Sequence, residues 1–421
     1  MQGGFFKKSE LAVLNRQPSL VPKCSACRLY LNGCLSPKMK VDGLGKRGIL
    51  ILAEASGYNE DLQGKPLVGR TGQFLEQTLQ KFGVDMRRDC WLYNSVICRP
   101  SGSAKDNRSP TFKEIGYCRP NVIRTILDLK PTVIIPLGSA AVQSLMGWLW
   151  LGESGGGEKQ DKRGNKQMGV WDGWRIPCQE INCWLCPTWH PSHVMRQDDR
   201  GGRSNEVLQM FFEQHLEAAV NLQDRPWIEV PDYARQVRCI LDHEEAARAV
   251  RSIIQANRPT AYDYETTHLK PDHPDAAIFS CALSNGKDTI SFPWHGQAVE
   301  AMREFLLSNV PKLNWNEKFE LRWSKRILGI WPRNGIYDGM IGTHVLDNRS
   351  NITSAKFQAW VRLGFKAWDA HVTPYLIGKG SNSANRIREL DLPSLLKYGG
   401  LDALVEYKID KLQMKELGIE P

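Results

Sequence analysis

Apolar runs and amphipathic segments alternate through the first half of the chain. The segments 47–57, 90–97 and 132–138 each hold a continuous apolar run, which is typical of a buried strand. The segments 69–83 and 118–131 repeat apolar residues at helical spacing. This alternation predicts a mostly parallel sheet with helices on both faces, and ligands of such sheets bind at the carboxyl ends of the strands.

The rest of the first half adds a helix, a strand and a polar insertion. The segment 139–147 is expected to be a helix, and 183–196 a strand that runs into a polar loop. The segment 152–169 is rich in glycine and basic residues and has almost no apolar side chains, which predicts an exposed loop. Such a loop could contact a DNA backbone, but a plain solvated insertion fits the composition equally well.

The second half begins after a segment with two prolines and few helix signals. We interpret this segment, 223–236, as a linker between a domain over 1–222 and a domain over 237–421. Strand and helix patterns then alternate again, and the last third is mainly helical in pattern, so the second domain is also expected to be α/β. The expected helices are 242–257 and 297–309, and the expected strands are 260–266, 277–284 and 288–294.

Composition favours a cytoplasmic protein with a polyanionic partner. The chain has 421 residues and a formal net charge of +9, and its hydrophobic and charged fractions of 42% and 24% are ordinary for a globular protein. A positive charge of this size favours nucleic acid as the partner. No apolar run reaches the roughly 18 to 20 residues of a membrane span. Residues 1–14 lack the apolar core and cleavage site of a signal peptide.

Four acidic residues of the second half stand where metal ligands could lie. Asp263 and Glu265 are two apart on an expected strand, so both point to the same face. Glu320 lies in an amphipathic segment. Asp402 follows Tyr398 by four residues, so Tyr398 and Asp402 share one helix face. Such acids can form an oxygen-rich pocket for two Mg²⁺ or Mn²⁺ ions. Two such ions can activate water for phosphodiester hydrolysis.

In this order, the acidic motifs resemble those of DEDD-type 3′→5′ exonucleases whose third motif contains tyrosine, as in the proofreading domains of family A DNA polymerases. The motif D-x-E is 263–265, the motif N-x-K-[FY]-D corresponds to 316–320, and the motif Y-x-x-x-D is 398–402. The resemblance covers about 225–421. It implies an RNase H-like 3′→5′ exonuclease domain with two Mg²⁺ or Mn²⁺ ions, acting on single-stranded or frayed 3′ ends of DNA.

The resemblance also implies a role for each of five side chains. Tyr398 would orient the attacking water, and the four acids would bind the metal ions. Glu320 stands where the family usually has Asp, but a glutamate can still reach a metal with its additional methylene, so activity is expected. The implied catalytic residues are Asp263, Glu265, Glu320, Tyr398 and Asp402.

The chain has 11 cysteines, of which four are candidate metal ligands. Their spacing suits either Zn²⁺ or an iron–sulfur cluster and does not choose between the two. A second C-x₂-C pair, Cys183 and Cys186, lies in a strand pattern whose alternation does not form a ligand knuckle, so we expect it and the other five cysteines to be buried thiols. The four candidate ligands are Cys24, Cys27, Cys98 and Cys118.

Residues near these cysteines resemble the motifs of family 4 uracil-DNA glycosylases, which carry a [4Fe-4S] cluster. The similar segments are 52–75, 92–100 and 187–196, and the resemblance covers roughly 20–218. It implies a three-layer α/β/α domain with its pocket at the strand ends, and it places the four cysteines at the positions of the cluster ligands. The chemistry of such a pocket is base flipping followed by cleavage of the N-glycosidic bond.

The resemblance assigns the pocket residues as well. His190 would lie at the base and Asn94 would read its edge, while Glu54 and Glu60 would assist with water or with the oxocarbenium ion. Two departures weaken the pocket, since Ser56 replaces a loop proline and Leu67 replaces a stacking Phe, and an aromatic platform contributes about 1 to 3 kcal/mol per base. We therefore expect little or no uracil excision. The implied pocket residues are Glu54, Ala55, Glu60, Leu67, Asn94 and His190.

Three functional hypotheses remain open at this point. The leading one is a phage-like 3′→5′ exonuclease fused to a cluster-bearing, glycosylase-like DNA-binding domain. In that hypothesis the protein is the proofreading subunit of a split family A polymerase, bound to a separate polymerase polypeptide in the cytoplasm of a bacterial host. The second is a bifunctional repair enzyme that excises uracil and trims ends. The third makes the N-terminal domain a scaffold without chemistry, and a stand-alone end-trimming nuclease is the alternative to the polymerase subunit.

Overall fold

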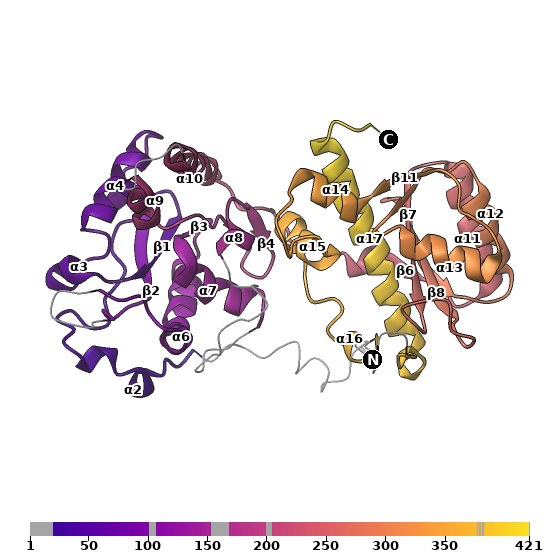
Figure 1. Ribbon diagram of the computed structural model, residues 1–421, viewed down its shortest axis with the longest axis horizontal. Helices are drawn as coiled ribbons and strands as arrows, with labels where there is room; N and C mark the ends of the chain where they lie inside the picture. Colours follow the sequence, from indigo (N-terminus) through magenta and orange to yellow (C-terminus); the bar gives the residue numbers. More distant parts are fainter. Residues whose placement is uncertain are drawn as a thin grey trace. The chain divides into compact units, whose positions relative to one another are not determined.

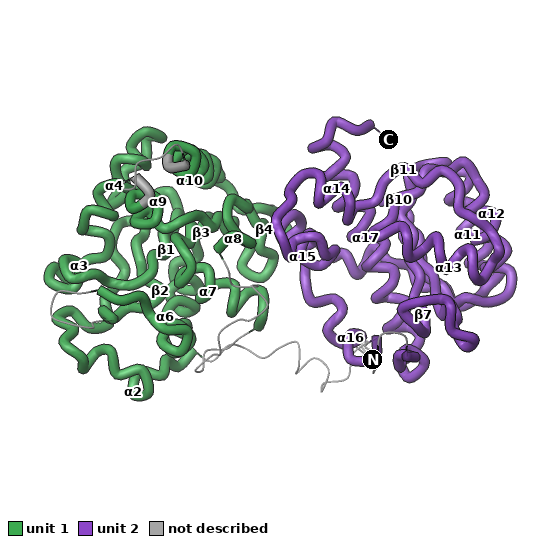
Figure 2. The backbone as a smooth tube through the Cα atoms, in the orientation of Figure 1, with its two compact units in different colours: residues 1–230 green, residues 231–421 purple. Residues whose placement is uncertain are grey.

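The computed structural model describes residues 20–100, 107–152, 168–198, 204–376, 378, 380 and 383–420. Most of the expected glycine-rich loop, residues 153–167, lies outside the described residues. The chain divides into two compact units, Met1–Val230 and Pro231–Pro421, each with its own sheet (Figures 1 and 2). No helix in the described ranges is long and apolar enough to cross a membrane.

The sheet of the first unit has the strand order β2-β1-β3-β5-β4. The central strand β1 (Ile49–Ala55) pairs in parallel with β2 (Cys90–Val96) and β3 (Val133–Pro136). The strand β5 (Cys183–Leu185) continues the parallel part beside β3, and β4 (Ile176–Cys178) closes the edge in the antiparallel direction. The predicted, mostly parallel sheet is therefore confirmed.

Helices cover both faces of this sheet (Figure 1). Ile49 and Ile51 of β1 pack with Leu75 of α4 and Phe212 of α10, while α6 and α7 pack against β2 and β1. This arrangement is the predicted three-layer α/β/α fold. The helices are α2 (Cys24–Cys27), η1 (Leu29–Leu31), α3 (Tyr58–Gln63), α4 (Arg70–Gln80), α5 (Met86–Asp89), α6 (Phe112–Leu129), α7 (Gly138–Leu149), α8 (Met168–Trp171), α9 (Pro191–Asp198) and α10 (Ser204–Val220).

Two helices differ from the sequence-based expectation. The helix α6 begins at Phe112, six residues before the expected start, because Thr111 and Glu114 form a reciprocal capping box. Part of the expected polar loop is the helix α9, which begins with Pro191, a residue suited to the first turn of a helix. Polar composition alone hid this helix, since only one side of it is apolar.

The sheet of the second unit is mixed, with the strand order β11-β10-β7-β8-β9-β6. The strands β7, β8 and β9 form an antiparallel meander, and β10 pairs in parallel with both β7 and β11. This topology is the predicted RNase H-like α/β fold, with β7 at its centre. The strands are β6 (Val237–Cys239), β7 (Thr260–Thr266), β8 (Ile278–Ser284), β9 (Thr289–Pro293), β10 (Lys312–Asn314) and β11 (Gly335–Asp338).

The long helix α17 crosses one face of this sheet, and α11 and α12 cover the other (Figure 1). Gly400 allows the close approach of α17, because a Cβ atom there would lie 2.3 Å from Cγ1 of Val237 on β6. The helical elements are η2 (Ala234–Gln236), α11 (His243–Ala256), α12 (Gln297–Leu307), α13 (Lys318–Leu328), α14 (Gly339–Leu346), α15 (Ala355–Leu363), α16 (Thr373–Leu376), η3 (Ile387–Glu389) and α17 (Leu392–Glu416).

Candidate active sites

Alternation along β7 separates an apolar face from an acidic one. Tyr262 and Tyr264 are buried in the core formed with α11 and α12. Asp263 and Glu265 therefore point to the opposite face, toward α17. Asp402 on α17 completes the group, since one carboxylate oxygen from each of the three acids lies within 4.8 Å of the other two.

These three carboxylates form a donor set that fits a divalent cation. Burial, together with the charge of Asp402, raises the pKa of Asp263 to about 8. Burial also raises the pKa of Asp402 to about 6 and that of Glu265 well above its usual range. Without a cation, the ionised acids repel one another in a poorly solvated site. Hard carboxylate oxygens at this spacing suit Mg²⁺ or Mn²⁺.

Two neighbouring side chains hold Asp402 in place. The indole Nε1–H of Trp368 donates a hydrogen bond of 2.5 Å to Oδ1 of Asp402. The hydroxyl of Tyr398, one turn earlier on α17, hydrogen-bonds the same carboxylate. The sequence analysis missed Trp368, because it lies 34 residues before Asp402 in an irregular segment without a periodic pattern.

Glu320, the fourth predicted acid, lies near this group but outside the set within 4.8 Å. It is 3% exposed in the first turn of α13, and its Oε2 is buried without a hydrogen-bond partner among the described residues. The turn before α13 is fixed by Asp338, which accepts hydrogen bonds from the backbone N–H groups of Asn316 and Glu317 at 3.1 and 2.9 Å. Asp338 thus fixes the turn that leads into the helix carrying Glu320.

A fifth acid, Glu406, also lies in this region, although the sequence analysis did not select it. It is 8% exposed and follows Asp402 by one helical turn on α17. Burial raises its pKa, and the negative charges of Asp263, Asp402 and Glu320 raise it further. The spacing of four residues after Asp402 was the available signal, because residues at i and i+4 share a helix face.

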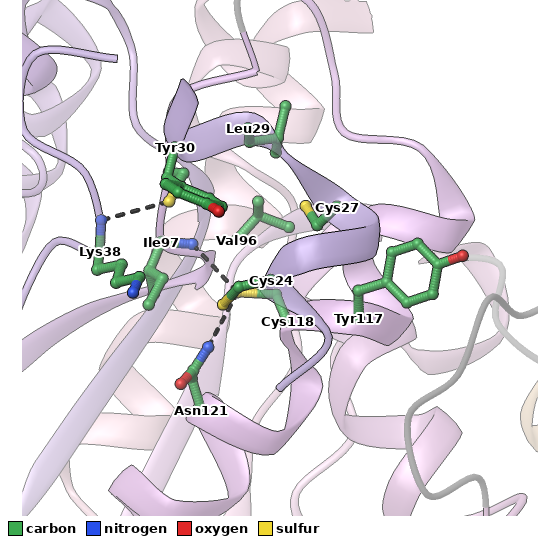
Figure 3. A pocket seen from close by; sticks show the side chains of 11 residues that line it. Cys24, Cys27, Leu29, Tyr30, Lys38, Val96, Ile97, Tyr117, Cys118 and Asn121 are labelled. Carbon is green, nitrogen blue, oxygen red and sulfur yellow. Dashed lines mark hydrogen bonds between the residues drawn. The ribbon is translucent and has the colours of Figure 1, made fainter. Parts of the chain in front are cut away.

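The four predicted cysteine ligands line one cavity in the first unit (Figure 3). Cys24 and Cys27 lie on α2, Cys98 follows β2, and Cys118 lies in α6. Backbone and side-chain N–H groups point at two of the sulfur atoms. Lys38 N–H donates to Cys98 at 3.3 Å, and Asn121 Nδ2–H donates to Cys118 at 3.5 Å.

The donor set of this cavity fits a metal centre. Four thiolates are the ligands of tetrahedral zinc sites and of iron–sulfur clusters alike. The four cysteines, far apart in the sequence, therefore meet where either centre could be held.

The second C-x₂-C pair belongs to the core, as the sequence analysis expected. Cys183 and Cys186 are 1% and 4% exposed at and just after β5. Of the remaining cysteines, Cys34 and Cys239 are half-buried rather than fully buried.

The residues of the predicted base pocket lie at the carboxyl ends of β1, β2 and β5. Asn94 on β2 is 3% exposed, and its amide Nδ2–H donates to Oγ of Ser56 at 3.2 Å. Sδ of Met39 lies 3.9 Å from the same nitrogen. The amide that would read a base edge is therefore already engaged within the protein.

His190 is held as a neutral imidazole. Burial lowers its pKa to about 4, and its Nδ1 lies 2.8 Å from Oγ of Ser192 and 3.3 Å from the backbone nitrogen of the same residue. A neutral imidazole has one donor and one acceptor nitrogen. In the tautomer whose Nδ1 accepts from Ser192, Nε2–H can donate to a developing oxyanion of a leaving base.

The other predicted pocket residues stabilise the loop after β1. Oε2 and Oε1 of Glu60 accept hydrogen bonds from the N–H groups of Gly57 and Leu67 at 2.5 and 2.7 Å. Leu67 has a left-handed φ of 55° and is 4% exposed, with its side chain in the core beside α4. Glu54 and Ala55 are half-buried at the end of β1, where the Glu54 carbonyl accepts from Ser95 Oγ at 2.6 Å.

Family and sequence comparisons agree for the first unit. Residues 43–216 match the family model of the uracil DNA glycosylase superfamily. The type-4 uracil-DNA glycosylase of Pyrobaculum aerophilum is 34% identical over 201 residues, which are 47% of this chain and 93% of that protein. The enzyme of the same name from Thermotoga maritima is 30% identical over 202 residues, 46% of this chain and 86% of that protein.

One further similar protein and two solved structures also match part of the chain. A DNA polymerase of Bacillus phage SP01 is 23% identical over 368 residues, and the match covers 79% of this chain, more than either unit contains, and 36% of the polymerase. Brucella melitensis NrnC has a TM-score of 0.31, with 16% identity over 38% of this chain and 74% of that chain. Escherichia coli RNase D has a TM-score of 0.32, with 14% identity over 43% of this chain and 45% of that chain. Through its first unit the chain belongs to the type-4 uracil-DNA glycosylase family, and a second α/β unit follows it.

Proposed function

We propose that the second unit is a metal-dependent 3′→5′ DNA exonuclease. The observation that carries the proposal is the meeting of Asp263, Glu265 and Asp402, from β7 and α17, within 4.8 Å of one another. Tyr398 hydrogen-bonds one of these acids, and Glu320 is buried within reach of the charge of Asp263, with Oε2 unpaired among the described residues. These positions correspond to the three ordered motifs on which the resemblance rests.

The side chains divide the work of phosphodiester cleavage. When bound, the divalent cations would activate the water and stabilise the leaving oxygen. Asp263, Glu265 and Asp402 would hold the cations, and Trp368 keeps the Asp402 carboxylate in one orientation. The Tyr398 hydroxyl lies against Asp402, where it can orient a water toward the terminal phosphate.

The expected substrate is the 3′ end of DNA, presented as a single strand or as a frayed primer end. The membership of the first unit in a DNA repair family and the net charge of +9 both favour DNA as the polymer. We further propose that the nuclease edits primer ends for a family A DNA polymerase, acting as a proofreading subunit. The match to a phage DNA polymerase, which extends through both units, supports this partner.

The nuclease proposal is tested with single-stranded DNA labelled at its 5′ end. Mg²⁺ should give a ladder that shortens from the 3′ end, and chelator should stop it. The double variant Asp263→Ala, Glu265→Ala should lose nearly all degradation while it still binds DNA. Full activity in this variant would refute the assignment. Co-purification with a family A polymerase, followed by extension of a mismatched primer, tests the proofreading role.

For the first unit we propose a [4Fe-4S] cluster on the four cysteines and a DNA-binding role with little or no uracil excision. The support for weak excision is the engagement of the Asn94 amide by Ser56, which stands where the family has proline. The neutral, buried His190 supports the bifunctional alternative. Uracil-containing DNA separates the two, because a glycosylase leaves an alkali-sensitive site even in chelator.

A further inference from the structure

Three helices of the first unit enclose a cavity that takes no part in the two sites described above. The helices α4, α9 and α10 pack against one another, and α9 follows the strand β5 (Figure 1). The cavity between them has a volume of about 320 Å³, which lies within the size range of small-ligand sites. Its lining includes Arg70, Phe74, Ser192, Met195, Arg196 and Gln209.

The polar part of this cavity carries positive charge without a compensating acid. Arg70 on α4 and Arg196 on α9 are exposed, and neither guanidinium has an ion pair or hydrogen bond among the described residues. No Asp or Glu of the described ranges lines the cavity. Glu213, which accepts from the lining residue Gln209 at 2.9 Å, is itself paired with Lys81 at 2.7 Å. Two unpaired arginines at one cavity are the donors that proteins use for phosphate groups.

The backbone adds to the attraction for an anion. Arg70 is the first residue of α4, and the N-cap Gly69 has no side chain that could accept from the free N–H groups of this helix end. Ser192 lies in the first turn of α9, and the first turns of both helices lack an acidic residue. The N-terminus of a helix carries partial positive charge. Two arginines and two helix N-termini therefore act on the same cavity.

The rest of the lining is apolar, and the cavity adjoins the predicted base pocket. Phe74 stacks on Phe212, with 6.1 Å between the ring centroids, and Met195 adds a flexible apolar side chain to the lining. Ser192 joins the two sites, because it lines the cavity and its Oγ lies 2.8 Å from Nδ1 of His190. An anionic group, an apolar surface and continuity with a base pocket together describe a nucleotide within a strand.

We propose that this cavity binds the backbone of a single DNA strand, with Arg70 and Arg196 on one phosphate next to the nucleotide at His190. Phe74 and Met195 contact the sugar or base that follows this phosphate. The inference rests on the proposed DNA-binding role of the first unit and assigns residues to it. A phosphate contact carries no base information, so the unit can hold DNA of any sequence without excising uracil.

Binding of a fluorescent, circular single-stranded oligonucleotide to the full chain tests the proposal at several salt concentrations. The circle has no 3′ end for the second unit, and chelator keeps it intact. The double variant Arg70→Gln, Arg196→Gln should bind about 10- to 100-fold more weakly, because it lacks charge-assisted hydrogen bonds. The slope of log affinity against log salt should become shallower by about 0.7, the contribution of one phosphate of a single strand. The melting temperature should not change, because both side chains are exposed.

Two matched variants separate this contact from a general loss of charge. Arg70→Lys, Arg196→Lys keeps both charges and should keep the salt slope while it binds more weakly, because a lysine cannot form the two-pronged contact. Arg248→Gln, Arg251→Gln removes two charges from α11 of the second unit, where the arginines face Glu244 and Glu304, and should leave affinity and slope unchanged.

The outcomes distinguish the inference from the role on which it rests. Unchanged affinity and slope in the Arg70→Gln, Arg196→Gln variant would overturn the inference alone. So would a deoxynucleoside monophosphate that displaces the circle at equal phosphate concentration, because the cavity would then select a free nucleotide. An unaltered protein that does not bind the circle would instead overturn the proposed DNA-binding role of the first unit.

Discussion

Removal of divalent cations should make the protein less stable as the pH rises. In the unfolded chain Asp402 loses its proton near its ordinary pKa of 3.8, whereas in the folded protein burial raises this pKa to about 6. Between these values the folded state binds a proton that the unfolded state has released, so stability falls with rising pH. Asp263, with its pKa raised from 3.8 to about 8, acts in the same direction over a wider range.

The size of the effect follows from Asp402 alone. Each pH unit between the unfolded and the folded pKa of a group lowers the free energy of unfolding by about 1.4 kcal/mol. For Asp402 the interval from 3.8 to about 6 therefore lowers it by about 3 kcal/mol. For domains of 150 to 250 residues, 1 kcal/mol shifts the melting temperature by about 2 to 4 °C. Asp402 alone should therefore lower the melting temperature by about 6 to 12 °C between about pH 4 and pH 8 in chelator, Asp263 adds to this fall, and the fall should be much smaller when Mg²⁺ neutralises the acids.

The assay is thermal unfolding of the full chain across this pH range, with and without Mg²⁺. The double variant Asp263→Asn, Asp402→Asn is the control, because it removes both titrating groups. Subtracting its melting temperatures cancels titration elsewhere, such as that of His190, whose lowered pKa of about 4 acts in the opposite direction. A difference that stays constant with pH, or that persists unchanged in Mg²⁺, would refute the reasoning.

Three further changes test single contacts. Trp368→Phe removes a hydrogen bond to Asp402, and hydrogen bonds to charged groups contribute about 1.5 to 3 kcal/mol. The exonuclease rate should therefore fall about 10- to 100-fold. An unchanged rate would exclude a positioning role for Trp368. Protein purified anaerobically should be brown with broad visible absorption, and Cys98→Ala should bleach it; colourless protein with stoichiometric zinc would contradict the cluster. Leu67→Phe should raise uracil excision from a low starting level. Strong excision by the unaltered protein, lost in His190→Ala, would disprove the claim that this pocket excises little uracil.

The sequence predicted those parts of the site that local periodicity controls. The alternation of β7 placed Asp263 and Glu265 on one face, and the i, i+4 spacing placed Tyr398 beside Asp402. Both follow from the geometry of a single strand or helix, so they do not depend on how the elements pack.

Contacts made by tertiary packing could not be predicted from local periodicity. Trp368 reaches Asp402 from an irregular segment, and nothing in the residues between them signals the contact. Met39 likewise lies against Asn94 from a position 55 residues away. The meeting of the four cysteines around one cavity also appears only in the folded chain, since they are spread over nearly 100 positions of the sequence.

The central claim is that Asp263, Glu265 and Asp402 bind the cation that drives cleavage. Anomalous diffraction from crystals soaked in Mn²⁺ tests it most directly, because the signal locates the ion without reference to activity. The account predicts a peak among the three carboxylates, about 2.0 to 2.3 Å from an oxygen of each. Nuclease-active protein whose crystals show no peak there, with Mn²⁺ bound elsewhere, would contradict it.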